Sequence, residues 1–314
     1  MLSPILSLGA VRIIHDFLED LKLPSEMSAK SYVVGFTSAV MWSPYFASVS
    51  LVLHYLDIQY KDYIIYGIGL SLLSLLVGNI LFAIWEKQNP FSKREAIVEP
   101  LGKEHRYQLI KLVLFVFVLM GSCLLIEKTT GWSMIVIVSL VSVIVPLVHG
   151  LLSSDWKRVL PLLDDFRNKS VSMMNNEIML FMSAGMLAFA MKGTALMNGV
   201  SVFLIGLAQQ SFFLFAIAIM VIVLGITFIG VHQIAAVGAL AMQLSTSDLG
   251  MSNMALALIL LLTWAASTAL SPFSGLNLLV KRFAGISSKE AFGAIGQHLI
   301  ILSLIGILII SFIV

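Results

Sequence analysis

Charged residues are scarce in this chain. Only 11% of its 314 residues are Asp, Glu, Lys or Arg, whereas 59% are hydrophobic and the mean hydropathy is +0.99. One water-soluble core could not bury that much apolar surface, so the composition predicts an all-α, polytopic membrane protein. The net charge of +2 is too small to indicate a nucleic-acid partner. The expected partner is the lipid bilayer.

Cysteine is nearly absent as well. The one cysteine, Cys123, lies within an apolar run, which excludes an internal disulfide framework, a Cys-rich zinc site and an iron–sulfur cluster. The HExxH, GxSxG, paired-aspartate prenyltransferase and Walker motifs are also missing, so a membrane enzyme or an ATP-driven pump lacks its minimum residues. We therefore expect no catalytic residue, no protein-bound metal and no cofactor, with sodium considered only as a coupling ion.

Acidic residues are missing from the middle of the apolar runs. All 17, from Asp16 to Glu290, fall in loops or at the ends of runs. A carboxylate-based sodium/proton antiporter needs an intramembrane carboxylate, so that class is disfavoured.

Apolar windows near the length that crosses a bilayer recur along the chain. They cover residues 33–54, 63–85, 108–126, 133–152, 178–191, 212–231, 252–280 and 292–314. The loops 86–106 and 153–177 are rich in Lys and Arg, which places both loops and the N-terminus in the cytoplasm and the C-terminus outside a cytoplasmic (inner) membrane. Within the second loop, helical spacing predicts an interfacial helix over 155–172.

The segment 212–245 is predicted to be a re-entrant hairpin. A third basic group, Lys281, Arg282 and Lys289, is cytoplasmic only if this segment does not cross the membrane completely. Gly230, His232 and Gln233 suit a turn at membrane depth. The alternative is an ordinary span over 212–231 followed by a surface segment, with His232 as a hydrogen-bonded structural residue.

The same Ser-Pro-aromatic sequence interrupts two apolar runs, at residues 42–48 and 270–277. We expect two broken helices, each with the serine capping its second half and the proline at the first position of that half. The freed N–H groups would then face an anion. The alternative is a pair of proline kinks with incidental serines. The candidate residues at the two breaks are Ser43, Pro44, Ser48, Ser271, Pro272, Ser274, Gly275 and Asn277.

The two breaks predict an internal repeat, since Ser43 and Ser271 lie 228 positions apart. The second repeat ends at residue 314, so the first ends at Glu86, where an apolar run gives way to a basic loop. This predicts one repeat over 1–86 and another over 87–314, with inverted topology because an odd number of crossings separates the breaks. The same spacing places residue 3 opposite Val231, which lies near the predicted hairpin turn of the second repeat. The chain would then begin inside the corresponding hairpin of the first repeat, so we expect the front of that repeat to be missing.

The order of elements near the C-terminus resembles the ion transporter superfamily. A hairpin with a glycine-containing turn, the polar linker 245–252, a broken span and a final span follow one another, and Gly225–Val280 carries most of the likeness. That group includes arsenite permeases, divalent-anion symporters and the large subunits of tripartite dicarboxylate transporters. The resemblance implies an elevator-type transporter whose hairpins and broken helices form the substrate site. The residues Gly230 to Gln233 depart from the Ser-Asn-Thr hairpin signature of the symporters, which leaves the substrate open.

The predicted function is secondary transport of a small, anionic solute, driven by a sodium or proton gradient. The alternative is a truncated, non-transporting membrane protein or a partner subunit of a transporter. Under either hypothesis, the protein could form a homodimer.

Overall fold

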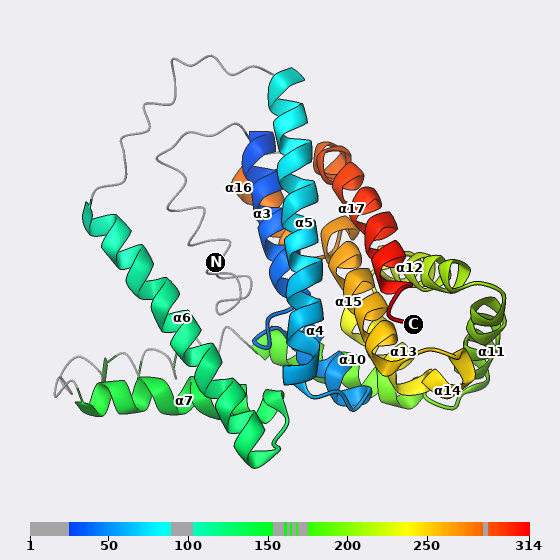
Figure 1. The fold of residues 1–314 in the computed structure, drawn as a ribbon, viewed down its shortest axis with the longest axis horizontal. Helices are drawn as coiled ribbons and strands as arrows, with labels where there is room; N and C mark the ends of the chain where they lie inside the picture. Colours follow the sequence, from blue (N-terminus) through cyan, green and yellow to red (C-terminus); the bar gives the residue numbers. More distant parts are fainter. Residues whose placement is uncertain are drawn as a thin grey trace.

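The computed structural model describes residues 25–88, 103–152, 160–161, 164, 168, 175–284 and 288–314. Every secondary-structure element in these ranges is a helix, as expected (Figure 1). The helices are α3 (Ser25–Val40), α4 (Ala47–Tyr55), α5 (Tyr60–Gln88), α6 (Lys103–Thr130), α7 (Met134–Leu152), α10 (Asn175–Met191), α11 (Ala195–Gln210), α12 (Phe212–Phe228), α13 (Gln233–Gln243), α14 (Thr246–Leu249), α15 (Asn253–Leu270), α16 (Gly275–Ala284) and α17 (Ser288–Ile310). Nearly all of the predicted interfacial helix 155–172, and residues 1–24 of the predicted first repeat, fall outside the described residues.

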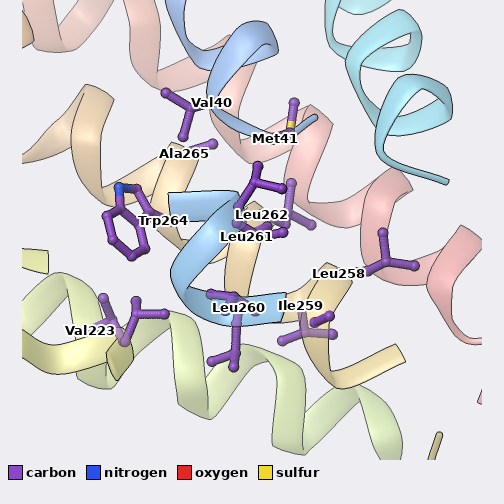
Figure 2. Close-up of a cluster of buried hydrophobic side chains, with 14 of the residues drawn as sticks. Val40, Met41, Val223, Leu258, Ile259, Leu260, Leu261, Leu262, Trp264 and Ala265 are labelled. Carbon is purple, nitrogen blue, oxygen red and sulfur yellow. The ribbon is translucent and has the colours of Figure 1, made fainter. Parts of the chain in front are cut away.

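Helix α15 forms the centre of the molecule. Its sequence is apolar on all sides, and every residue from Ala255 to Ala269 is buried. It packs against α3, α4, α12, α13 and α17. Figure 2 draws Val40 and Met41 beside Leu261, Leu262 and Ala265, and Val223 beside Trp264, so the end of α3 and the side of α12 meet on this helix.

The outer helices expose apolar side chains. On α5, Ile65 is 76% and Leu72 is 60% exposed, although the helix is 29 residues long and strongly apolar. A protein surrounded by water rarely leaves such a stripe uncovered. Two described helical segments, α5 and 253–283, are long and apolar enough to span a membrane, and the bent pair α10–α11 makes a third if it counts as one span. The number of crossings and the positions of the termini remain predictions.

Both Ser-Pro sequences end a helix, as predicted. Helix α3 stops at Val40 and α4 starts at Ala47, and α15 stops at Leu270 and α16 starts at Gly275. The intervening residues form the same turn in both places. The Ser43 carbonyl accepts from Phe46 N at 3.1 Å, and the Ser271 carbonyl accepts from Ser274 N at 3.1 Å, with proline at the second position of each turn.

The predicted capping geometry is wrong. Because the chain makes a complete turn first, each second half begins after the turn, and neither proline is its first residue. In α4 the N-cap residue is Phe46, without a side-chain cap. In α16 the residue that caps is Ser274, whose Oγ accepts from Asn277 N at 3.1 Å.

Helices α12 and α13 are joined by a short turn at the predicted place. Gly230 has φ of +102° in this turn, a conformation that suits glycine. The two helices pack against each other. Whether this helical hairpin is re-entrant in a membrane remains a prediction. A further break, not predicted from the sequence, bends α10 and α11 by 77°.

Two sets of three helices pack in the same way. The start of α16 lies 228 positions after the start of α4, the spacing that also separates Ser271 from Ser43. The packing pairs also correspond. Helix α3 packs on α5, and its counterpart α15 packs on α17, the counterpart of α5. Likewise α3 packs on α16, and α15 packs on α4. In Figure 1, α5 and α17 lie beside each other and run in opposite directions.

Candidate functional site

The candidate site lies where the second break meets the α12–α13 turn. The Ser271 hydroxyl donates to the backbone carbonyl of Thr227, near the end of α12, at 3.1 Å. The Gln233 side chain, at the start of α13, donates to Thr268 Oγ1 in the last turn of α15 at 3.2 Å. Ser271, Thr268 and Gln233 are all buried. The fold therefore brings together two groups of predicted residues that are about forty positions apart in the sequence.

Asn277 holds the second break in its bent shape. Its side-chain Nδ2 donates to the carbonyl of Ala269 at 2.7 Å and to the carbonyl of Ser271 at 2.8 Å. These contacts fix the amide orientation and leave Oδ1 pointing the other way. Asn277 is 6% exposed, and Oδ1 has no hydrogen-bond partner among the described residues. A buried acceptor without a partner is unfavourable and is normally satisfied by water, an ion or a ligand.

The start of α16 also carries backbone donors. No described residue accepts a hydrogen bond from the backbone N–H of Gly275 or Leu276. These groups lie at the positive end of the helix dipole. The break thus combines an unpaired oxygen, which suits a cation or a donor, with N–H groups that suit an anion.

His232 plays a local structural role in this structure. Its Nδ1 accepts from the backbone N–H of Ile234 at 3.2 Å, which caps α13. The ring lies 6.4 Å from that of Phe181 on α10. The hydrogen bond from Ile234 N agrees with the alternative prediction that His232 is a structural residue and not a ligand-binding one.

The first break is closed by hydrogen bonds. Each carbonyl from Val40 to Pro44 accepts one, and the donors are the Ser48 hydroxyl at 2.9 Å, the Tyr63 hydroxyl, the Tyr60 hydroxyl at 2.8 Å, Phe46 N at 3.1 Å and the Ser50 hydroxyl at 2.9 Å. Ser43 Oγ accepts from Tyr45 N at 3.3 Å. The predicted residues Ser43, Pro44 and Ser48 therefore stabilise the fold, and the two breaks are not equivalent in their hydrogen bonding.

Sequence reasoning missed the residues that close the first break. Tyr60 and Tyr63 lie on α5, and Glu127, from the last turn of α6, accepts from Tyr60 N at 2.9 Å and from Lys61 N at 3.2 Å. Glu127 lies at the end of an apolar helix, as expected. Its side chain is only 5% exposed, which depends on the tertiary structure. No sequence pattern marks such contacts across 60 or more positions.

Two cavities among the described residues lie away from the candidate site. One lies between α3, α5 and α17, and the other lies beside Glu127, between the α4–α5 connection and the start of α7. Within the described part of the chain, no group of three or more His, Cys, Asp or Glu side chains could hold a metal ion. In comparisons with protein-family models, curated proteins and solved structures, none matches the chain.

Proposed function

We propose that the protein is a secondary transporter that moves a small, anionic solute across the cytoplasmic membrane with a sodium or proton gradient. The observation that carries the proposal is the contact between the second break and the α12–α13 turn, through Ser271 to Thr227 and Gln233 to Thr268. Transporters place their sites at such discontinuous helices because the freed backbone groups can bind solutes and ions there.

The arrangement of the two triplets of helices supports inverted repeats. Half-helix α3 packs on α16, and α15 packs on α4, so the first half of each broken helix lies beside the second half of the other. Antiparallel broken helices that cross near their breaks give this pattern. An inverted pair related by a two-fold axis in the membrane plane has the same geometry.

The second break is the site that we propose for solute and ion. The N–H groups at the start of α16 suit the anion, and Asn277 Oδ1 is placed to bind a coupling cation or a donor group of the solute. Ser271, Ser274 and Asn277 are buried at the break, so binding requires the hairpin and the break to separate. The two inter-helix hydrogen bonds are the contacts that would open.

Transport can be tested with the full chain purified and reconstituted in lipid vesicles. Uptake of labelled dicarboxylates, sulfate and phosphate is measured under an inward sodium gradient, under an inward proton gradient and without a gradient. We expect gradient-dependent uptake of at least one anion. Ser271→Ala removes a hydroxyl group of the proposed site and should reduce this uptake at least several-fold, whereas Ser43→Ala at the closed break should retain it. Absence of gradient-driven flux with every anion would favour the non-transporting alternative.

A further inference from the structure

A polar cavity lies between the first half of α3, the last third of α5 and the middle of α17. Its volume is about 80 Å³, room for a few water molecules or one phosphate-sized group. The polar side chains that line it are Lys30, Gln88, Gln297 and His298. None of these residues belongs to the proposed transport site.

Lys30 gives the cavity a positive charge. Its Nζ lies 4.5 Å from the centroid of the Trp85 ring, whose electron-rich face holds the ammonium group in place. No described carboxylate lines the cavity. Glu26, one turn earlier on α3, is exposed and interacts electrostatically with Lys30, and Glu86 near the end of α5 is exposed as well. The cavity therefore favours an anion.

His298 supplies the second observation. It is 4% exposed, and its Nε2 lies 3.3 Å from the Ser74 hydroxyl. Its Nδ1 has no hydrogen-bond partner among the described residues. If Ser74 donates to Nε2, the proton of the neutral ring is on Nδ1, which is then a buried donor without an acceptor. The Nδ1 atom has less than 1 Å² of accessible surface, so His298 contributes an enclosed polar wall to the cavity and not a direct ligand contact.

The position of the cavity indicates where the anion comes from. Only three residues separate α16 from α17, so the basic end of α16, Lys281 and Arg282, lies near the start of α17. Lys87 lies in the last turn of α5. Ile84 lines the cavity and is 48% exposed on the outer side of the same helix, where an acyl chain could pack.

We propose that this cavity binds the phosphate group of an anionic phospholipid. The same chemistry would accept free inorganic phosphate, but basic pockets among helix ends, flanked by tryptophan and an exposed apolar face, are typical of lipid headgroup sites. Lys30 contacts the phosphate, and the lipid joins α3, α5 and α17.

The test compares the detergent-purified full chain with its Lys30→Gln variant and with Lys192→Gln, which removes an exposed lysine from the α10–α11 connection. Thermal unfolding is followed during titration with phosphatidylglycerol, phosphatidylcholine or inorganic phosphate, and native mass spectrometry counts the bound lipids. We expect phosphatidylglycerol alone to stabilise the wild type. The affinity should fall about fivefold in Lys30→Gln, the effect of one lysine at an anionic lipid surface, and should not change in Lys192→Gln.

Three results would overturn the proposal. Equal stabilisation by phosphatidylcholine would mean that the phosphate charge is not recognised. Unchanged phosphatidylglycerol binding in Lys30→Gln would place the lipid elsewhere. Stabilisation by inorganic phosphate, without any effect of phosphatidylglycerol, would identify the occupant as a free anion. If Lys30→Gln does not fold, Trp85→Leu takes its place, because it removes the aromatic face that positions the ammonium group.

Discussion

At the scale of single residues, Asn277 is a feature that distinguishes the second break from the first. Its side chain ties the second break together, while Val49 occupies the position 228 residues earlier in the first break. Tyr60 and Tyr63, which close the first break, correspond to Ser288 and Ala291 in the second. The second break therefore lacks the phenol groups that occupy the carbonyls of the first.

We predict that Asn277→Ala lowers the free energy of unfolding by about 1–3 kcal/mol, because two buried hydrogen bonds are lost. It should also abolish any stabilisation of the wild type by sodium relative to potassium. Thermal unfolding in detergent, with each cation at equal ionic strength, measures both effects. Asn79→Ala is the matched control, because the Asn79 side chain is exposed and bonds only within its own helix. Equal behaviour of the two variants would contradict the assigned role.

Glu127 is a second residue whose role depends on contacts far along the chain. We predict that Glu127→Ala destabilises the protein by about 1–3 kcal/mol, because the N–H groups of Tyr60 and Lys61 lose their acceptor. Glu127→Gln keeps one acceptor oxygen and should cost less. Hydrogen exchange at these two amides, together with thermal unfolding, provides the measurement. Glu26→Ala, at an exposed position, should change stability by less than about 0.5 kcal/mol, and an equal loss in both variants would disprove the capping role.

At the scale of elements, the α12–α13 turn depends on Gly230. An alanine there must adopt φ near +102°, so we predict that Gly230→Ala costs about 1–3 kcal/mol. Gly225→Ala, within α12 and with no heavy atom within 4 Å of the added methyl group, should be neutral or stabilising by up to about 1 kcal/mol. Melting temperatures by fluorescence-detected size exclusion distinguish the two, and a neutral Gly230→Ala would show that the turn adapts.

The packing of α5 on α3 depends on Gly78. A methyl group on this residue would lie 2.7 Å from Val34 Cγ1, closer than side chains approach. We predict that Gly78→Ala destabilises the protein by about 1–3 kcal/mol through overpacking. Gly69→Ala on the same helix meets no atom within 4 Å and serves as the control in the same unfolding assay. A stable Gly78→Ala protein would mean that the two helices separate without cost.

At the scale of the whole molecule, the ends of the helices differ in charge. Among the side chains that the structure describes, four basic residues and two acids lie at the end where α3 starts and α5 stops, namely Lys30, Lys87, Lys281 and Arg282 with Glu26 and Glu86. Near the α4–α5 connection the acids outnumber the bases, with Asp57, Asp62 and Glu127 against Lys61 and Lys128. The positive-inside rule then predicts that the first end is cytoplasmic. The orientation can be measured directly because the chain has a single, buried cysteine.

We predict that, in a Cys123→Ala background, Lys61→Cys reacts with a membrane-impermeant maleimide in intact cells. Lys87→Cys should react only after the membrane is permeabilised. Both side chains are exposed in the structure, so the difference would report the side of the membrane and not burial. The reverse pattern would invert the proposed orientation.

Several features of the fold follow from local sequence. The two Ser-Pro turns and the turn at Gly230 fall where they were predicted, and the starts of α4 and α16 have the same spacing of 228 as Ser43 and Ser271. The proposed capping by Ser43 and Ser271 was wrong, since the local pattern marks a break but not the geometry of the turn within it. The bend between α10 and α11 was not predicted from the sequence, although Thr194 caps the N-terminus of α11 through its side chain.

The sequence by itself determined the helical membrane character and the positions of the breaks, because hydropathy, proline and glycine act over a few neighbouring residues. Only the tertiary structure decided which break is closed and which contacts the hairpin. The carbonyls of the first break are occupied by side chains of α5, and those side chains reach them only because α3 and α5 pack together. The second break meets Thr227 and Gln233 because α15 lies in the centre, with α12 and α13 against it. Hydrogen bonds between distant segments depend on which helices become neighbours, and packing sets that choice.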